Sequence, residues 1–154
     1  MAADPGLKIK DLSLGKLEAI FLVEKSANQY PWTRAIIKQG IAAGFNYIGA
    51  YINQKLVAYI VLDIKSVEAQ ILNLSVIPEF QSRGIGGQLL EYAIKFAKNN
   101  KSDSIFLEVR ASNIKALRLY KAAGFTKSGF RKNYYPASGT KEDALVLNLK
   151  LTLS

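Results

Sequence analysis

A glycine-rich segment in the middle of the chain has the residue types that an anion-binding loop needs. It reads Gln81-Ser82-Arg83-Gly84-Ile85-Gly86-Gly87 and stands between a strand-like and a helix-like run. Glycines let backbone N–H groups converge at a helix N-terminus, where unpaired donors and the helix dipole favour a phosphate. The spacing fits neither a P-loop nor a dinucleotide-binding fingerprint. The segment predicts a phosphate-binding loop of another kind, and the alternative is a plain glycine-rich turn.

Two missing residue types limit the remaining chemistry. The chain has no Cys and no His. This excludes a thiolate nucleophile, a disulfide, a cysteine-ligated zinc site and a Ser-His-Asp triad. Acid–base work then falls to carboxylates, Lys, Tyr or water, and we expect no metal.

Positive charge gathers in the second half of the chain. The chain has 21 basic and 12 acidic residues, a net charge of +9, and the excess lies between residues 80 and 141. Nucleic acid and phosphate-rich small ligands are the two classes of partner that such a surface attracts. Because there is no long run of like charge and no aromatic RNA-binding motif, we expect the small ligand and no nucleic acid.

Length and composition predict one domain over residues 1–154. Of the 154 residues, 49% are hydrophobic, and neither a repeat nor a linker interrupts them. No apolar run is long enough to span a bilayer, and the first residues lack a signal-peptide layout. We therefore expect a cytoplasmic protein without membrane contact.

Hydrophobic periodicity and turn signals predict the elements that position these residues. Strands are expected at 7–10, 47–51, 55–64, 69–77, 104–109, 125–131 and 144–151, and helices after Ser13, after Thr33, over 87–99 and over 113–123. Asn53-Gln54 predicts a hairpin turn, and Gly124 fits the position just after a helix. The predicted fold is an α/β (α+β) domain with a mixed sheet flanked by helices, in the approximate order βααββββαβαββ.

Several motifs together resemble the GNAT N-acetyltransferases. The glycine-rich loop fits that family's cofactor signature, Gln/Arg-x-x-Gly-x-Gly/Ala. Further similar segments are Tyr30–Thr33, Leu107–Asn113, Leu119-Tyr120 with Gly124-Phe125, Arg131–Pro136 and Glu142–Ala144. They follow the family's order over nearly the whole chain. Within the family, they resemble bacterial enzymes that acetylate the N-terminal alanine of a small-subunit ribosomal protein.

The resemblance implies acetyl-CoA as co-substrate and assigns roles to residues of this chain. Glu108 would be the general base and Tyr120 the general acid. The acetyl-CoA-binding residues would be Leu74, Ser75, Val76, Ser82, Arg83, Gly84, Ile85, Gly86, Gly87 and Asn113.

The acceptor peptide would be bordered by Tyr30, Trp32, Tyr134 and Tyr135. A tight aromatic wall favours a small first side chain such as alanine. The implied reaction is direct attack of the N-terminal α-amine in a ternary complex.

The acid–base chemistry of these side chains is compatible with catalytic roles, but purely structural roles are also possible for the same residues. An α-amine, with a pKa of about 7.7–8.0, must lose a proton that Glu108 could accept directly or through a water, and a phenol suits protonation of a departing sulfur. Glu108 could instead simply pair with a nearby Lys or Arg. Tyr120 could be a core aromatic, Tyr134-Tyr135-Pro136 a turn, and Tyr30 and Trp32 core or covering residues.

Two other functions also stay open at this point. One is an acetyltransferase of the same fold with broader specificity for protein N-termini, lysines or small amines. The other is a non-catalytic domain that binds acyl-CoA or a partner protein.

Overall fold

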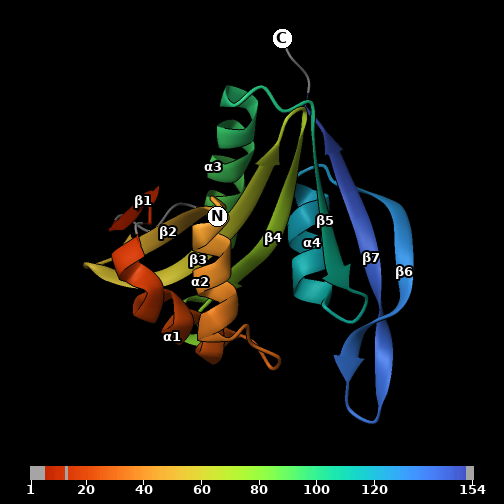
Figure 1. Ribbon diagram of the computed structural model, residues 1–154, viewed down its shortest axis with the longest axis horizontal. Coiled ribbons are helices and arrows are strands. Elements are labelled where there is room, and N and C mark those ends of the chain that lie inside the picture. Colours follow the sequence, from red (N-terminus) through yellow and green to blue (C-terminus); the bar gives the residue numbers. More distant parts are fainter. Residues whose placement is uncertain (1–5, 13, 152–154) are drawn as a thin grey trace.

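The computed structural model describes residues 6–12 and 14–151, which form one seven-stranded mixed sheet with helices on both faces (Figure 1). The elements are β1 (Leu7–Asp11), η1 (Leu14–Lys16), α1 (Leu17–Ala27), α2 (Arg34–Ala42), β2 (Asn46–Ile52), β3 (Lys55–Lys65), β4 (Glu68–Val76), η2 (Pro78–Phe80), α3 (Ile85–Asn99), β5 (Ser104–Arg110), α4 (Ile114–Ala122), β6 (Thr126–Ala137) and β7 (Thr140–Lys150). The strands lie in the order β1-β2-β3-β4-β5-β7-β6. The predicted fold class is confirmed.

The predicted order contained one strand too many. Three strands lie between α2 and α3, in agreement with the predicted ranges 47–51, 55–64 and 69–77 but not with the four written in the predicted order. The described chain turns only at Asn53-Gln54 and at Ser66-Val67 within 46–76, so two hairpins join three long strands. Asn53 and Gln54 have φ values of +50° and +66°, which match the primed turn that fits the twist of paired strands.

Local sequence signals explain most helix ends. The Thr33 and Asn113 side chains accept hydrogen bonds from the backbone N–H groups of Ile36 and Ala116, each at 3.2 Å, and so cap α2 and α4. Gly124 follows α4 with φ +102°, as expected for a residue that ends a helix in the left-handed region. The predicted Ser13 cap lies outside the described residues.

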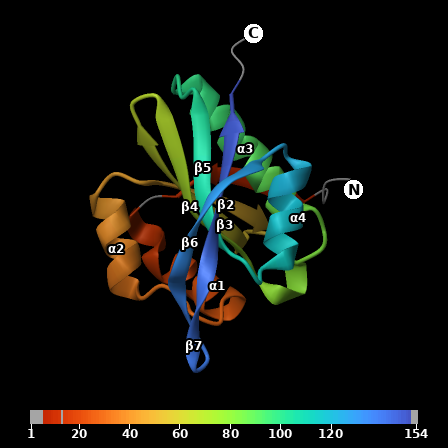
Figure 2. The same cartoon turned by 90° about the vertical axis from the view of Figure 1, so that its right-hand side faces the viewer.

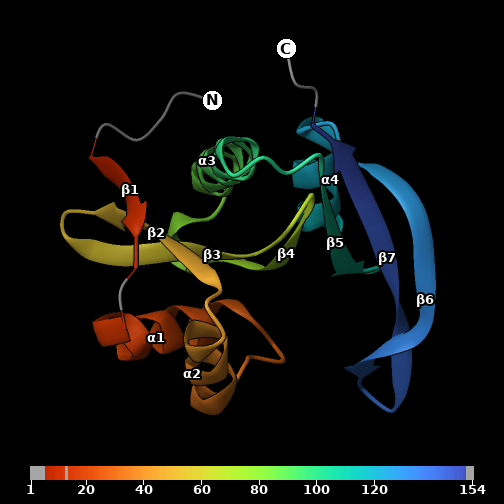
Figure 3. The same ribbon diagram turned by 45° about the horizontal axis from the view of Figure 1, so that its top comes forward.

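The sheet separates two pairs of helices. Figures 2 and 3 show α1 and α2 on one face of the sheet and α3 and α4 on the other. The centre of the core is β3, where every side chain from Leu56 to Leu62 is buried, so both layers pack against it.

The sheet opens between its two central parallel strands. β4 and β5 pair only from Glu68–Ile71 to Ser104–Leu107, and beyond this point they diverge (Figure 1). A shift of register beside Val61 and Leu62 places one extra β4 residue, Leu72, at the start of the divergence. The ends of β4 and β5 therefore form two separate walls.

The β6–β7 hairpin is longer than predicted. It turns at Ser138-Gly139, with φ +71° at Gly139, and Tyr134-Tyr135-Pro136 lies inside β6 instead of forming a turn. Pro136 is compatible with this strand because β6 is the edge of the sheet (Figure 2), where a missing N–H breaks no ladder bond.

Candidate active site

A groove of about 650 Å³ runs along the end of β4, where the sheet opens. Of the predicted acetyl-CoA-binding residues, it is lined by Leu74, Ser75, Val76, Ser82, Gly84, Ile85, Gly86, Gly87 and Asn113. Arg83 is not part of the lining, and its guanidinium lies 4.7 Å from the ring centre of Phe80. The fold thus brings strand, loop and helix residues that are up to 39 positions apart in the sequence, from Leu74 to Asn113, to one surface.

The glycine-rich loop has the backbone shape of an anion cradle. Ser82 and Gly84 both adopt left-handed conformations, with φ +62° and +82°, and such alternation turns successive N–H groups inward. Gly84 is also the N-cap of α3. It provides no side-chain cap, and the first turn of α3 carries no acidic residue. The first N–H groups of α3 are therefore donors suited to a phosphate.

Gly86 and Gly87 lie inside the first turn of α3, and they affect the width of the groove more than the shape of the loop. A Cβ at Gly86 would stand 3.5 Å from Leu119 Cδ2 and 3.8 Å from Val76 Cγ2, and one at Gly87 would stand 3.7 Å from Leu119 Cδ1. Their missing side chains keep the space between α3, α4 and β4 open.

Several lining residues were not among the predicted acetyl-CoA-binding residues, although one of them, Gln81, belongs to the predicted phosphate-binding loop. They are Ala27, Asn28, Phe80, Gln81, Lys115, Ala116, Arg118 and Leu119. Lys115 and Arg118 are three positions apart on α4, so helical spacing alone could have placed both on one face. Asn28 comes from the end of α1, and no local pattern indicates that α1 ends beside β4.

Tyr120 lies at the groove with its ring buried. It is 6% exposed and packs edge-to-face on Phe125 with ring centres 5.6 Å apart. Burial raises the pKa of the Tyr120 hydroxyl above its ordinary value, and the nearby Tyr135 adds to the effect. The hydroxyl therefore keeps its proton at neutral pH.

Glu108 is held by an ion pair outside the groove lining. Its side chain is 12% exposed, and Oε2 lies 2.6 Å from Nε of Arg131 on β6. The plainer alternative for Glu108, pairing with a basic residue, is thus present in the structure. Tyr135 lies close enough to interact electrostatically with both Glu108 and Tyr120.

An aromatic cluster joins the hairpin to the connection between α1 and α2 (residues 28–33). The Arg110 guanidinium lies between two rings, 4.4 Å from the ring centre of Tyr30 and 4.6 Å from that of Tyr135. Tyr134 packs edge-to-face on Tyr135 at 5.1 Å, and the Arg131 guanidinium lies 5.4 Å from the Tyr134 ring. Burial, helped by the charge of Glu108, raises the pKa of Tyr135 to about 12.

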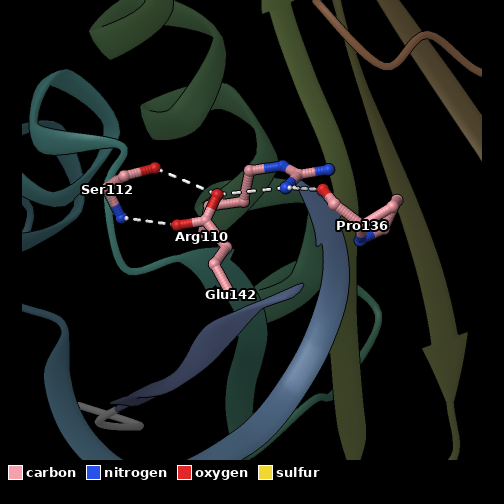
Figure 4. A network of polar contacts seen from close by, with 4 residues as sticks. All are labelled: Arg110, Ser112, Pro136 and Glu142. Carbon is pink, nitrogen blue, oxygen red and sulfur yellow. Dashed lines mark hydrogen bonds and ion pairs between the residues drawn. The ribbon is translucent and has the colours of Figure 1, made fainter. Parts of the chain in front are cut away.

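Arg110 is fixed by polar contacts (Figure 4). Its Nη1 donates to the Pro136 carbonyl at 2.7 Å and to Glu142 Oε1 at 3.0 Å. Glu142 also accepts hydrogen bonds from the hydroxyl and the backbone N–H of Ser112. The bonds from Ser112, followed by the charge and bond of Arg110, hold the pKa of Glu142 below its ordinary value.

Three of the four predicted acceptor residues, Tyr30, Tyr134 and Tyr135, come together in this cluster. Trp32 differs, because its side chain packs half-buried against the hydrophobic core. Within residues 6–12 and 14–151, no group of three or more acidic side chains is placed to hold a metal ion. In the same part of the chain, no helix is long and apolar enough to cross a membrane.

The fold and the groove have counterparts in a known family. The sequence model of the acetyltransferase (GNAT) family matches residues 11–125, which is more than half of the chain. The chain therefore belongs to the GNAT family of acetyltransferases. The resemblance seen in the sequence motifs is confirmed.

Individual relatives narrow the likeness further. The chain is 31% identical over 147 residues to the ribosomal protein bS18-alanine N-acetyltransferase of Escherichia coli K12, covering 94% of this chain and 98% of the relative. The crystal structure of the ribosomal-protein-S18-alanine N-acetyltransferase from Escherichia coli superposes with a TM-score of 0.91 at 30% identity, over 96% of both chains. A GNAT acetyltransferase from Elizabethkingia anophelis, with acetyl-CoA bound, gives 0.78 at 25% identity over 96% of this chain and 100% of the other.

Proposed function

We propose that this enzyme transfers an acetyl group from acetyl-CoA to the N-terminal α-amine of a protein, with the N-terminal alanine of a small-subunit ribosomal protein as its acceptor. The observation that carries the proposal is the likeness to the bS18-alanine N-acetyltransferase of Escherichia coli, at 31% identity over 94% of this chain. Such an acceptor would be met in the cytoplasm, and the reaction needs no nucleic acid, membrane or metal.

The groove fits acetyl-CoA chemically. Ser82 and the start of α3 present backbone donors for the pyrophosphate, and Lys115 and Arg118 add positive charge at the rim. Leu74–Val76 have no strand partner on the β5 side. The Val76 carbonyl accepts a hydrogen bond from Gln81 Nε2 at 2.9 Å, so an extended ligand arm would have to use the other backbone groups on this side. When bound, acetyl-CoA supplies the thioester that an amine can attack.

Glu108 serves as the base in this proposal. An α-amine with a pKa of about 7.7–8.0 is mostly protonated at neutral pH, so its proton must be removed before or during attack. Glu108 accepts it directly or through a water, while Arg131 holds the carboxylate in place. Because the chain has no Cys, the acetyl group passes to the amine without an acyl-cysteine.

Tyr120 serves as the acid. Its buried hydroxyl is protonated when the reaction begins, because burial raises its pKa. In this proposal it gives that proton to the CoA sulfur only as the C–S bond breaks and negative charge develops on the sulfur. The position of Tyr120 in the groove lining, next to Leu119 and Ala116, supports this role.

The acceptor lies beside the aromatic cluster. Tyr30, Tyr134 and Tyr135 form one wall, and Trp32 supports the connection that carries Tyr30. A wall of packed rings favours a small first residue, since each extra methylene must displace packed atoms. An α-amine also loses its proton more easily than a lysine, by about 2.5 pKa units or roughly 3.5 kcal/mol.

Two peptides test the proposal. The first begins with Ala, and the second is the same peptide with a blocked N-terminus and free lysines. We expect mass spectrometry to find one acetyl group on the α-amine of the first and none on the second. Preferential modification of the lysines would indicate a lysine acetyltransferase. Binding of acetyl-CoA without any transfer would indicate a non-catalytic domain.

A further inference from the structure

Glu24, near the end of α1, is a buried carboxylate that the proposed chemistry does not use. It is 2% exposed, and no other acidic residue of the described chain is buried to this degree. Oε1 accepts hydrogen bonds from Tyr59 Oη at 2.7 Å, Asn73 Nδ2 at 2.8 Å and Ser75 Oγ at 3.1 Å. Oε2 accepts one from the backbone N–H of Trp32 at 2.9 Å.

The four donors are all neutral, so the carboxylate is stabilised by dipoles instead of a cation. Burying a charge in this way is costly unless every hydrogen bond is made. Burial and the charge of Glu24 together raise the pKa of Tyr59, and they raise that of Tyr47 to about 12. Since apolar residues often fill such positions at no loss of stability, a carboxylate here calls for a specific task.

One side of the network ends at the groove. Tyr59 on β3 is paired with Ser75 on β4, and Asn73 precedes Ser75 by two positions on the same face. Ser75 Oγ also accepts a hydrogen bond from Asn28 Nδ2 at 2.8 Å. Ser75 and Asn28 both line the groove, so Glu24 is one residue away from its wall.

The other side ends at the α1–α2 connection. The Trp32 N–H that donates to Glu24 belongs to the same segment as Tyr30, whose ring packs on Arg110. Glu24 therefore holds this segment at one end and the aromatic cluster holds it at the other.

We propose that Glu24 is a positioning residue that fixes the distance between β4 and the α1–α2 connection, and so aligns the acceptor amine with the acetyl group. The inference rests on the proposed function, because it needs the groove to hold acetyl-CoA and the connection to border the acceptor. Glu24 acts through Ser75 and Trp32 and touches neither substrate.

The first test is Glu24→Gln, which keeps the size of the side chain. It replaces one of the two carboxylate oxygens by an NH₂ group, which cannot accept the hydrogen bonds that the oxygen accepted. We expect kcat/KM for the Ala-peptide to fall about ten- to hundredfold, the size of effect that small misplacements have. Acetyl-CoA affinity by calorimetry should stay within about twofold, since the phosphate cradle is untouched. Glu91→Gln, at an exposed site on α3, is the matched control and should leave both values unchanged.

A second readout does not depend on acetyl transfer. Trp32 is the single Trp of the chain, so its fluorescence reports on the connection alone. Glu24→Gln should make Trp32 more accessible to acrylamide quenching, with and without acetyl-CoA. Ser75→Ala removes one of the two β4 donors and leaves the Trp32 hydrogen bond intact, and it should lower kcat/KM without changing Trp32 quenching.

The outcomes separate this inference from the proposed function. If the wild type acetylates no peptide, the proposed function fails, and the quenching comparison still decides whether Glu24 holds the connection. Unchanged kcat/KM and quenching in folded Glu24→Gln would overturn the positioning role, as would a matching loss of acetyl-CoA affinity. If Glu24→Gln does not fold, Tyr59→Phe removes one donor only and must give a smaller change of the same kind. No change in Tyr59→Phe and Ser75→Ala would then overturn the inference.

Discussion

Nε of Arg131 lies 2.6 Å from Oε2 of Glu108, and the two residues come from strands that are not neighbours in the sheet. Arg131 pairs with Ala144 on β7, and Ala144 pairs with Arg110, two positions after Glu108 on the same face of β5. The small Ala144 side chain lets Arg131 reach over β7. One oxygen of Glu108 is therefore in ion-pair contact with Arg131 without making a hydrogen bond of regular geometry, and the other oxygen or a water offers a second route for the proton.

Glu108→Gln tests this role through its pH dependence. We expect kcat/KM to fall about 10²-fold or more near pH 7, where the amine is mostly protonated, and to fall less near pH 9, where it is mostly free. Steady-state rates with the Ala-peptide at both pH values measure this. A loss of equal size at both would show that Glu108 acts only as the partner of Arg131.

Tyr120→Phe removes the proposed acid and keeps the ring contact with Phe125. The expected result is a fall in kcat of about 10²–10⁴-fold with little change in acetyl-CoA affinity. Because burial raises the pKa of Tyr120, the wild type should show no loss of rate from its ionisation up to about pH 10. Tyr92→Phe, at a more exposed position on α3, is the control. A loss of only a few-fold would mean that Tyr120 is a packing residue.

Gly86 offers a graded test of the groove. A Cβ alone meets only ordinary contacts with Leu119 and Val76, so Gly86→Ala should keep acetyl-CoA affinity and stabilise α3 by up to about 1 kcal/mol. The two methyl groups of Gly86→Val would project into the groove beside Leu119 and Val76, and calorimetry should show an affinity for acetyl-CoA lower by more than about tenfold. Equal affinity of a folded Gly86→Val protein would place the phosphates elsewhere.

Glu142→Gln should destabilise the protein in a pH-dependent way. The pKa of Glu142 in the folded protein is below its ordinary value of 4.5, so its stabilisation is present above that value and is lost as the pH falls through the folded-state pKa. We expect a melting temperature lower by about 2–4 °C at neutral pH, from a loss of about 1 kcal/mol. The difference from wild type should shrink below pH 4.5. A difference that stayed constant in calorimetric scans over this pH range would contradict a stabilising role of the ionised Glu142 carboxylate.

Most elements of the fold could be predicted from patterns within short segments of the sequence. The apolar periodicity of α3 and α4, the Asn53-Gln54 turn and the caps Thr33 and Asn113 are all properties of short segments, and the structure has each of them. The glycine-rich loop was also visible as a loop before a helix. The sequence did not show that Gly84 is left-handed while Gly86 and Gly87 are helical, because glycine permits both conformations.

Contacts between distant segments account for what could not be predicted. The strand that became β6 was predicted to end at Arg131, with a turn at Tyr134-Tyr135-Pro136 as one alternative, but it continues to Ala137. Pro136 is tolerated there because β6 is an edge strand, and the sheet order is not visible in the local sequence. Glu24 shares helical spacing with the apolar Leu17 and Ile20, which signals burial, but its four donors come from three other segments. The site roles of Glu108, Tyr120 and the cofactor residues stay predictions.

The N-terminus of α3 couples the stability of the protein to ligand binding. Gly84 caps α3 without a side chain, so the first turn of the helix depends on a bound anion or on water to satisfy its donors. A ligand that binds the folded state only, at a hundred times its dissociation constant, adds about 2.7 kcal/mol to stability. Amide exchange in the first turn of α3, and the survival of the protein against proteases, are therefore tied to how much acetyl-CoA surrounds it.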